Sequence, residues 1–166
     1  MFANLTVYTA IHVILGVLAL GLGVLALYRL ANFVMKSKLV AAYWAMSALT
    51  TATGFGFPFV KFLPSHMIGI LSMLSLVAMA LAAYRLKSRL GRVVYVLSTF
   101  ISVYFLTFVA IAQVFTKVPA LNAHGPGIDG TPFIVVQTLV LAIFIGGTTK
   151  VLRASRRLQA GSSVLT

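Results

Sequence analysis

The segment "LTVYTAIHVILGVLALGLGVLALY", residues 5–28, contains no charged side chain. An α-helix rises about 1.5 Å per residue, and about 20 apolar residues cross the hydrocarbon core of a bilayer. The segment is longer than the apolar region of a cleavable signal peptide, which has about 7–15 residues, and no basic residue precedes it. We therefore predict a transmembrane helix that the mature protein keeps.

The rest of the chain has the same character. Of its 166 residues, 61% are hydrophobic and 8% are charged, whereas about a quarter of the residues in soluble domains are charged. Further apolar stretches of spanning length lie at 39–60, 66–84, 93–115 and 132–151. We predict an all-α integral membrane bundle of five transmembrane helices, forming one domain over residues 1–157, with a cytoplasmic tail at 158–166.

The basic residues indicate how this bundle is oriented. All but two of the 13 lysines and arginines follow the first, third and fifth apolar stretches, and the exceptions are Lys61 and Lys117. Basic residues near span ends stay on the cytoplasmic side, so we predict an outside N-terminus and a cytoplasmic C-terminus. The net charge of +12 then favours anionic lipids on the cytoplasmic side. We expect no nucleic-acid partner, because no fold that reads bases is present.

Composition also limits the chemistry. The chain has no cysteine, which excludes disulfides, covalently attached haem and thiolate metal sites. Asp129 is its single acidic residue, so paired-carboxylate catalysis and oxygen-rich calcium or magnesium sites are excluded as well. Without a nucleophile–base arrangement, any enzymatic activity would have to rest on a cofactor.

In the predicted topology, every histidine and every glutamine except Gln159 lie in the outward half. His12 lies about 10 Å from the outer end of the first span, Gln113 about one turn from the outer end of the fourth, and Gln137 about 8 Å into the fifth. His12 shares one helix face with small residues, which mark contacts between membrane helices. These residues are Gly16, Ala19, Gly23 and Ala26.

This pattern favours two functions. In the first, His12, Gln113 and Gln137 fix the polar end of a small amphipathic ligand such as a lipid or quinone. Tyr8, one turn from His12, and Phe57, in a phenylalanine-rich mouth, would complete the site. In the second, the chain is a non-catalytic subunit of a larger membrane complex or a homo-oligomer, with small-residue faces as contacts. The polar side chains also have a purely structural interpretation, as hydrogen bonds across helices worth about 1 kcal/mol or less.

The alternative is a redox or metal protein. His12 and His66 could hold a non-covalent haem b, since neutral imidazole is a good axial ligand, although their different depths count against this pair. The three histidines and Asp129 could instead hold zinc or copper. No ligand spacing has the form of a metal motif, so the identity of any metal is open.

Four strings of the sequence carry a resemblance: "IHV" at 11–13, "GFGFPFVKFLPSH" at 54–66, "VFTKVPALNA" at 114–123 and "TPFIVVQ" at 131–137. With these strings the chain resembles a group of small uncharacterised polytopic proteins of bacteria. The resemblance covers most of the chain. It implies a multi-pass protein of the bacterial inner membrane, and it implies no activity.

Overall fold

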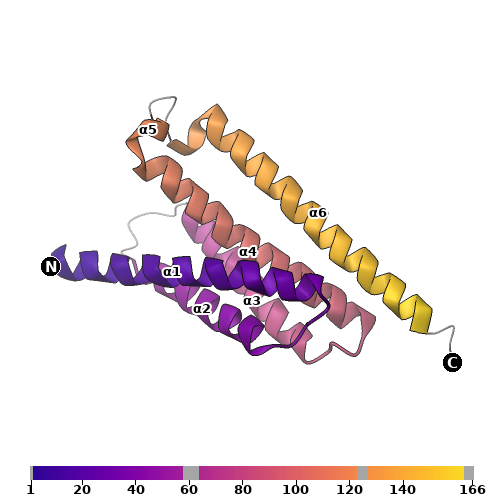
Figure 1. The fold of residues 1–166 in the computed structure, drawn as a ribbon. Helices are drawn as coiled ribbons and strands as arrows, with labels where there is room; N and C mark the ends of the chain where they lie inside the picture. Colours follow the sequence, from indigo (N-terminus) through magenta and orange to yellow (C-terminus); the bar gives the residue numbers. More distant parts are fainter. Residues whose placement is uncertain (1, 58–63, 123–126, 163–166) are drawn as a thin grey trace. The chain divides into compact units, whose positions relative to one another are not determined.

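The computed structural model describes residues 2–57, 64–122 and 127–162, and these residues are almost entirely helical (Figure 1). The long helices begin and end near basic residues or short connections, as membrane-spanning helices do. The elements are α1 (Phe2–Ala31), α2 (Lys38–Gly54), α3 (Pro64–Ala83), α4 (Arg89–Lys117), the single turn α5 (Pro119–Asn122), the 3-10 turn η1 (Gly127–Asp129) and α6 (Thr131–Ser162).

Four of these helices are long and apolar enough to cross a bilayer. They occupy Thr6–Ala31, His66–Ala83, Arg89–Lys117 and Thr131–Ser155, so four candidate membrane helices overlap the predicted spans at 5–28, 66–84, 93–115 and 132–151. The span at 39–60 corresponds to α2, which has 17 residues, and residues 58–60 lie outside the described part of the chain. The fifth crossing and the orientation therefore stay predictions. Helix α6 continues to Ser162, so residues 158–162 of the predicted tail are helical.

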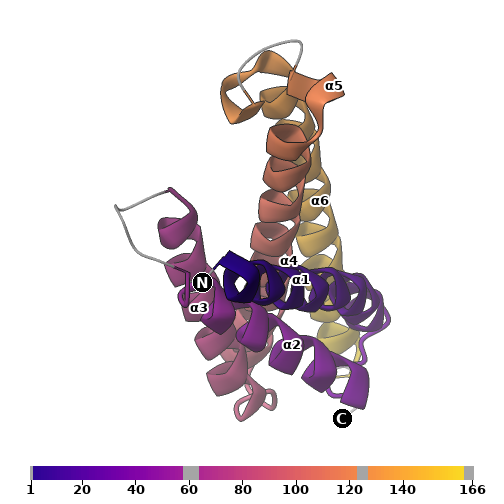
Figure 2. The same cartoon turned by 90° about the vertical axis from the view of Figure 1, so that its left-hand side faces the viewer.

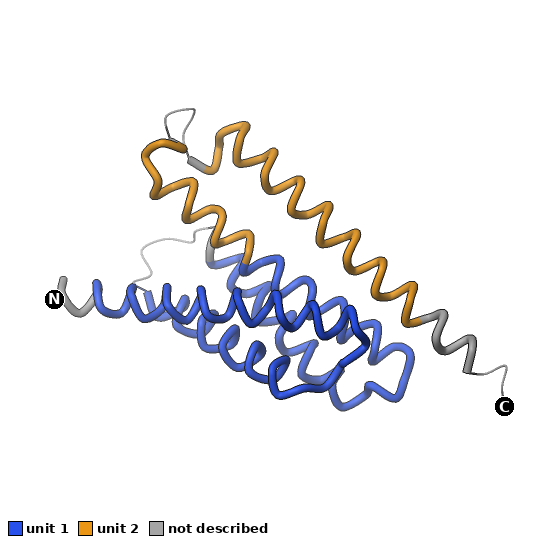
Figure 3. The backbone as a smooth tube through the Cα atoms, in the orientation of Figure 1, with its two compact units in different colours: residues 1–106 blue, residues 107–166 orange. Residues whose placement is uncertain are grey.

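The chain forms two compact units, residues 1–106 and residues 107–166 (Figure 3). Unit 1 contains α1, α2, α3 and the first part of α4. Unit 2 contains the last part of α4 together with α5, η1 and α6. The predicted single bundle over residues 1–157 remains a prediction.

Within unit 1, α1 and α2 run side by side in opposite directions (Figure 1, Figure 2). The small residues on α1 permit this close contact: Ala19 and Ala26 are completely buried, and the backbone at Gly16 faces the Thr50 side chain of α2. At Gly23, an added Cβ would lie 3.1 Å from the Tyr43 ring and 3.2 Å from Val103 of α4. The face of α1 that contains His12 and these small residues thus contacts other helices, as the small residues predict.

Polar side chains link α4 to this pair. The hydroxyl of Tyr43, which is fully buried, lies 2.6 Å from Ser102 Oγ. Ser102 donates its own proton to the carbonyl oxygen of Thr99, so Tyr43 is the donor toward Ser102. Tyr95, nearer the start of α4, donates from Oη to the carbonyl oxygen of Met35, in the connection between α1 and α2, at 2.9 Å. These two bonds fix the start of α4 against α2 and the connection before it.

Removal of the buried Tyr43 hydroxyl is expected to destabilise unit 1 measurably. In Tyr43→Phe, Ser102 Oγ loses its donor while keeping its own bond to Thr99, and such a loss costs about 1 kcal/mol. The midpoint of thermal unfolding in a mild detergent should fall. Tyr28→Phe is the control, because the Tyr28 side chain is 67% exposed and should leave the midpoint unchanged. Equal midpoints for both variants would show that the Tyr43–Ser102 bond contributes nothing to stability.

Helix α3 packs on α2 through the one tryptophan of the chain. Trp44 Nε1 donates to the carbonyl oxygen of Leu76 at 2.9 Å, and the Leu76 side chain is buried. Because this bond joins the middle of α2 to the second half of α3, it holds the two helices in a defined register. The connection between α3 and α4 is held by Arg92, which donates to the carbonyl oxygens of Leu86 and Lys87.

Unit 2 is built around Phe133 in the first turn of α6, which is 7% exposed. Its ring packs edge-on against Phe108 and Phe115 of α4, with centroid distances of 5.9 and 5.6 Å. One turn further along α6, Gln137 Nε2 donates to the carbonyl oxygen of Phe108 at 3.1 Å. The start of α6 therefore folds back on the end of α4 through aromatic packing and one buried amide.

Candidate ligand site

The polar side chains at the start of α1 meet the end of α2. Tyr8 Oη donates to the backbone carbonyl of Thr53 at 2.6 Å, and His12 Nδ1 lies 2.9 Å from Thr53 Oγ1. Tyr8 and His12 are one helical turn apart and so project from the same face of α1. Two side chains of α1 are thus attached to one residue of α2.

The hydrogen bonds of Thr53 define the state of the His12 ring. The Thr53 hydroxyl directs its proton to the carbonyl oxygens of its own helix, Leu49 at 2.8 Å and Thr50 at 3.0 Å. Its oxygen is therefore an acceptor toward His12, and Nδ1 carries the proton of the neutral ring. In that tautomer the other ring nitrogen, Nε2, has a lone pair. Among the residues that the structure describes, no group donates to it.

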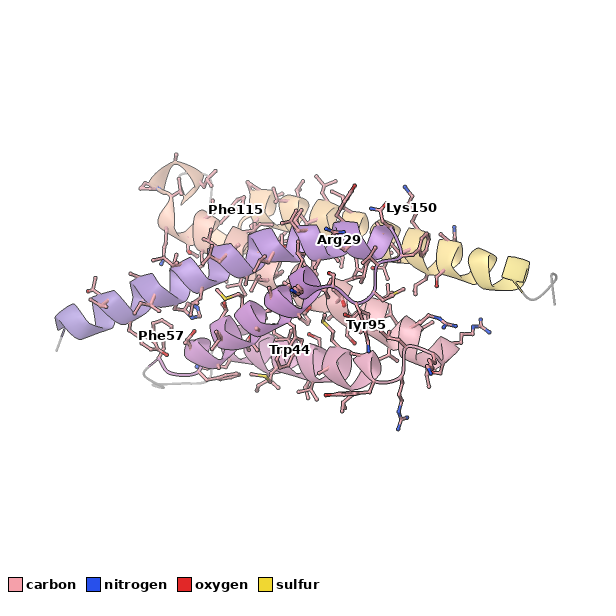
Figure 4. The ribbon with its side chains drawn as sticks, turned by 60° about the horizontal axis from the view of Figure 1, so that its bottom comes forward. Arg29, Trp44, Phe57, Tyr95, Phe115 and Lys150 are labelled. Atoms are coloured by element: carbon pink, nitrogen blue, oxygen red, sulfur yellow. The ribbon has the colours of Figure 1, made fainter. Side chains whose placement is uncertain are left out.

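Phe57 completes the cluster. Its ring lies edge-on to the rings of Tyr8 and His12, with centroid distances of 5.0 and 5.2 Å and interplanar angles of 74° and 90°. The backbone of Gly54 approaches the imidazole at Cε1, since an added Cβ would lie 3.5 Å from that atom. Phe57 lies at one end of the α1–α2 pair, and Tyr95 and Arg29 lie toward the other (Figure 4). We call Tyr8, His12, Thr53 and Phe57 the His12 cluster.

The two glutamines of the predicted site belong to unit 2. The side chain of Gln137 is buried, with 7% of its surface exposed. Its Oε1 atom is buried and has no hydrogen-bond partner among the described residues. The side chain of Gln113, near the end of α4, is exposed. The predicted pocket that combines these glutamines with His12 remains a prediction, because His12 lies in unit 1.

His66, the other predicted haem ligand, lies in the first turn of α3 and is partly exposed. Gly69, one turn after His66 in α3, packs against the ring of Phe55. The end of α2 therefore meets the start of α3 near this histidine. Across residues 2–57, 64–122 and 127–162, no three His, Asp or Glu side chains gather into a group that could hold a metal ion. His124 lies outside the described residues. Haem ligation by His12 and His66 stays a prediction.

Thr53 is the residue of the cluster that the sequence analysis missed. The neighbouring residues of α2 have other contacts: Ser47 is buried, the backbone of Gly54 approaches the His12 ring, and the Thr51 hydroxyl donates to the carbonyl oxygen of Ser47. The signal that could have found Thr53 is antiparallel pairing: if Gly16 faces Thr50, a residue one turn earlier on α1 faces one turn later on α2.

The fold defines the class of protein: a multi-pass α-helical membrane protein with at least four candidate spans. Comparison with protein-family models, with curated proteins and with solved structures gives no match. Its function has to be argued from its own residues.

Proposed function

We propose that the chain is a five-span protein of the bacterial inner membrane that binds a hydroxyl-bearing amphipathic molecule, such as a quinol or a lipid alcohol, at the His12 cluster. One observation carries the proposal. The imidazole of His12 is fixed by Thr53 in the tautomer that leaves Nε2 as an acceptor, and Nε2 is therefore suited to a hydroxyl donor. The location in the bacterial inner membrane is proposed from the resemblance that the four sequence strings carry.

The pairing of α2 with α1 supports a fifth crossing. Contacts run from Gly23 and Tyr43 at one end to His12 and Thr53 at the other. The 17 residues of α2 extend about 25 Å at helical rise, against a hydrocarbon core of about 30 Å. A helix that follows a spanning partner over this length, in the opposite direction, itself crosses most of the membrane.

The placement of basic residues supports an outside N-terminus. The bond from Tyr95 to Met35 brings the connection after α1 close to the start of α4, so two of the basic connections lie at the same end of unit 1. These connections contain Lys36, Arg85 and Lys87, and Lys38 and Arg89 are the first residues of the helices that follow them. Retention of basic residues in the cytoplasm then puts the His12 cluster at the outer end.

The surroundings of His12 suit a ligand with a polar head and an apolar body. The helix faces beside it present exposed apolar side chains, among them Val7 and Ile11, which are 59% and 51% exposed. The edge-on ring of Phe57 adds an aromatic wall. A ligand that lies along these side chains would remain in the lipid phase and place only its hydroxyl at Nε2. Such sites, mostly apolar with few polar groups, are typical of small-molecule binding.

Binding of decylubiquinol to the purified protein tests this proposal. We expect His12→Ala to weaken anaerobic binding about tenfold, which corresponds to the loss of one hydrogen bond of about 1.4 kcal/mol. His12→Gln, which keeps an acceptor, should retain part of the affinity. Decylubiquinone, which has no hydroxyl, should bind the wild type more weakly than the quinol.

His66→Ala is the matched control, and quinol binding should be unaffected by it. Equal affinities of wild type and His12→Ala would overturn the proposal. A purified protein with a haem spectrum that disappears in both histidine variants would instead establish the haem alternative, since a ligating histidine also has its second ring nitrogen bonded to a neighbour.

A second candidate function is that of a complex subunit, which one observation favours. Within unit 2, no atom lies within 4 Å of the Cβ that an alanine would have at Gly146 of α6. The neighbouring apolar side chains are exposed, with Ile143 70% and Ile145 55% accessible. A glycine on an exposed apolar face permits close approach of another membrane helix. Native mass spectrometry at natural abundance would detect the partner or a second copy.

A further inference from the structure

A cavity of about 650 Å³ lies in unit 1, away from the His12 cluster. It is bounded by the residues before α2, the first turns of α2, the last turns of α3, and Tyr95 at the start of α4. Its lining includes Ala41, Trp44, Ala80 and Tyr84 together with the exposed residues Lys36 and Lys38, and we call the part beside these two lysines its mouth.

Small side chains and two fixed hydrogen bonds explain why this cavity is present. Ala41 on α2 and Ala80 on α3 are too small to fill the space between the two helices. The bond from Trp44 to the carbonyl of Leu76 holds the indole in a fixed position. The bond from Tyr95 to Met35 fixes the connection that contains the lysines. The walls are therefore defined by bonded side chains at two points.

The charges at the mouth have no counterpart in unit 1. The single acidic residue of the chain is Asp129, which belongs to unit 2. No carboxylate of unit 1 can thus neutralise Lys36 or Lys38, both of which are exposed. Two exposed lysines that line one cavity, without acids in unit 1, are complementary to an anion, and their attraction to anionic lipid is strongest near the membrane surface.

The position along the helices matches the region between headgroups and acyl chains. The span His66–Ala83 ends one residue before Tyr84, whose side chain is 88% exposed. Aromatic rings favour this level of the membrane. Lys36 and Lys38 lie before and at the start of α2, where headgroups are expected, and Trp44 and Ala80 lie further along α2 and α3.

We propose that this cavity binds one anionic phospholipid, with the headgroup phosphate between Lys36 and Lys38 and part of one acyl chain along Trp44 and Ala80. The lysines select the negative headgroup, and the apolar walls select a molecule with a chain. A free phosphate uses only the mouth, and a zwitterionic lipid gains less from the lysines. The proposal is independent of the function assigned to the His12 cluster.

The chain supplies its own reporter, because Trp44 is its one tryptophan and lines the cavity. Brominated acyl chains quench tryptophan fluorescence at short range. In detergent micelles, brominated phosphatidylglycerol should quench Trp44 at a concentration about thirtyfold lower than brominated phosphatidylcholine, a ratio that corresponds to about 2 kcal/mol for the two lysines together. The preference should decline with added salt. Equal quenching by the two lipids would overturn the proposal.

Two pairs of substitutions separate the cavity from general surface charge. Lys36→Gln with Lys38→Gln should abolish the preference for phosphatidylglycerol. Lys87→Gln with Arg89→Gln removes the same charge from the same end of unit 1, at residues that do not line the cavity, and should leave the preference intact. An equal loss in both double variants would mean surface attraction alone.

Filling the cavity tests the acyl-chain part. Ala80→Phe should reduce quenching by both lipids, with Ala41→Leu on the opposite wall as the substitute if Ala80→Phe does not give a folded, monodisperse protein. Inorganic phosphate should not displace the brominated lipid. Unchanged quenching in the filled variants, or displacement by phosphate, would overturn the acyl-chain assignment.

Discussion

Gly23→Leu should prevent unit 1 from folding stably. An added Cβ at this position already lies 3.1 Å from the Tyr43 ring and 3.2 Å from both methyl groups of Val103, and both neighbours are completely buried. Leucine adds three further carbon atoms to a contact without space for one. Overpacking of this kind costs about 1–3 kcal/mol, and we expect leucine at the upper end and alanine near the lower end. Thermal unfolding and the yield of monodisperse protein in detergent measure the effect.

Gly21 provides the matched control on the same helix. Two residues away, it has no atom of unit 1 within 4 Å of the position of an added Cβ. Gly21→Leu changes composition and membrane hydropathy in the same way, and it should maintain or raise stability, since leucine is a better helix former than glycine by up to about 1 kcal/mol. Similar unfolding midpoints in the two leucine variants would contradict close packing at Gly23.

Local composition was sufficient to predict four spans of the fold. Long uncharged segments such as residues 5–28 have a single stable form in lipid, because every backbone group must be bonded within the helix. Residues 39–60 were less predictable. They contain no charged side chain, yet α2 ends at Gly54, followed by bonds from Phe55 and Gly56 to the carbonyl oxygens of Ala52 and Thr53. Hydropathy averages across such a helix end and cannot locate it.

The His12 cluster was predictable in part for the same reason. Spacing along one helix placed Tyr8 and His12 on a common face, and small residues indicated that this face meets another helix. Which residue of α2 they meet depends on the register between two helices, which no local pattern contains, and Thr53 was therefore missed. The cavity between α2 and α3 was not predicted either, because its lining comes from alanines on two helices that are distant in the sequence.

Single-cysteine labelling should give an all-or-none result for the topology. The chain has no cysteine, so each introduced thiol is the sole target of a membrane-impermeant maleimide. Asn32→Cys, at an exposed position after α1, should be protected in spheroplasts and react only after permeabilisation. Ser65→Cys, at the start of α3, and Ala120→Cys, at an exposed position in α5, should react directly. The physical reason is the retention of the basic connections around Asn32 on the cytoplasmic side.

Each departure from this pattern has a defined meaning. If Asn32→Cys and Ser65→Cys react alike, α2 does not cross the membrane, and the chain has four spans. If all three positions react in the opposite sense, the orientation is inverted. The His12 cluster then lies at the cytoplasmic end, and Lys36 and Lys38 lie at the outer end. The expected pattern requires that α2, although only 17 residues long, separates two connections that lie on opposite sides of the membrane.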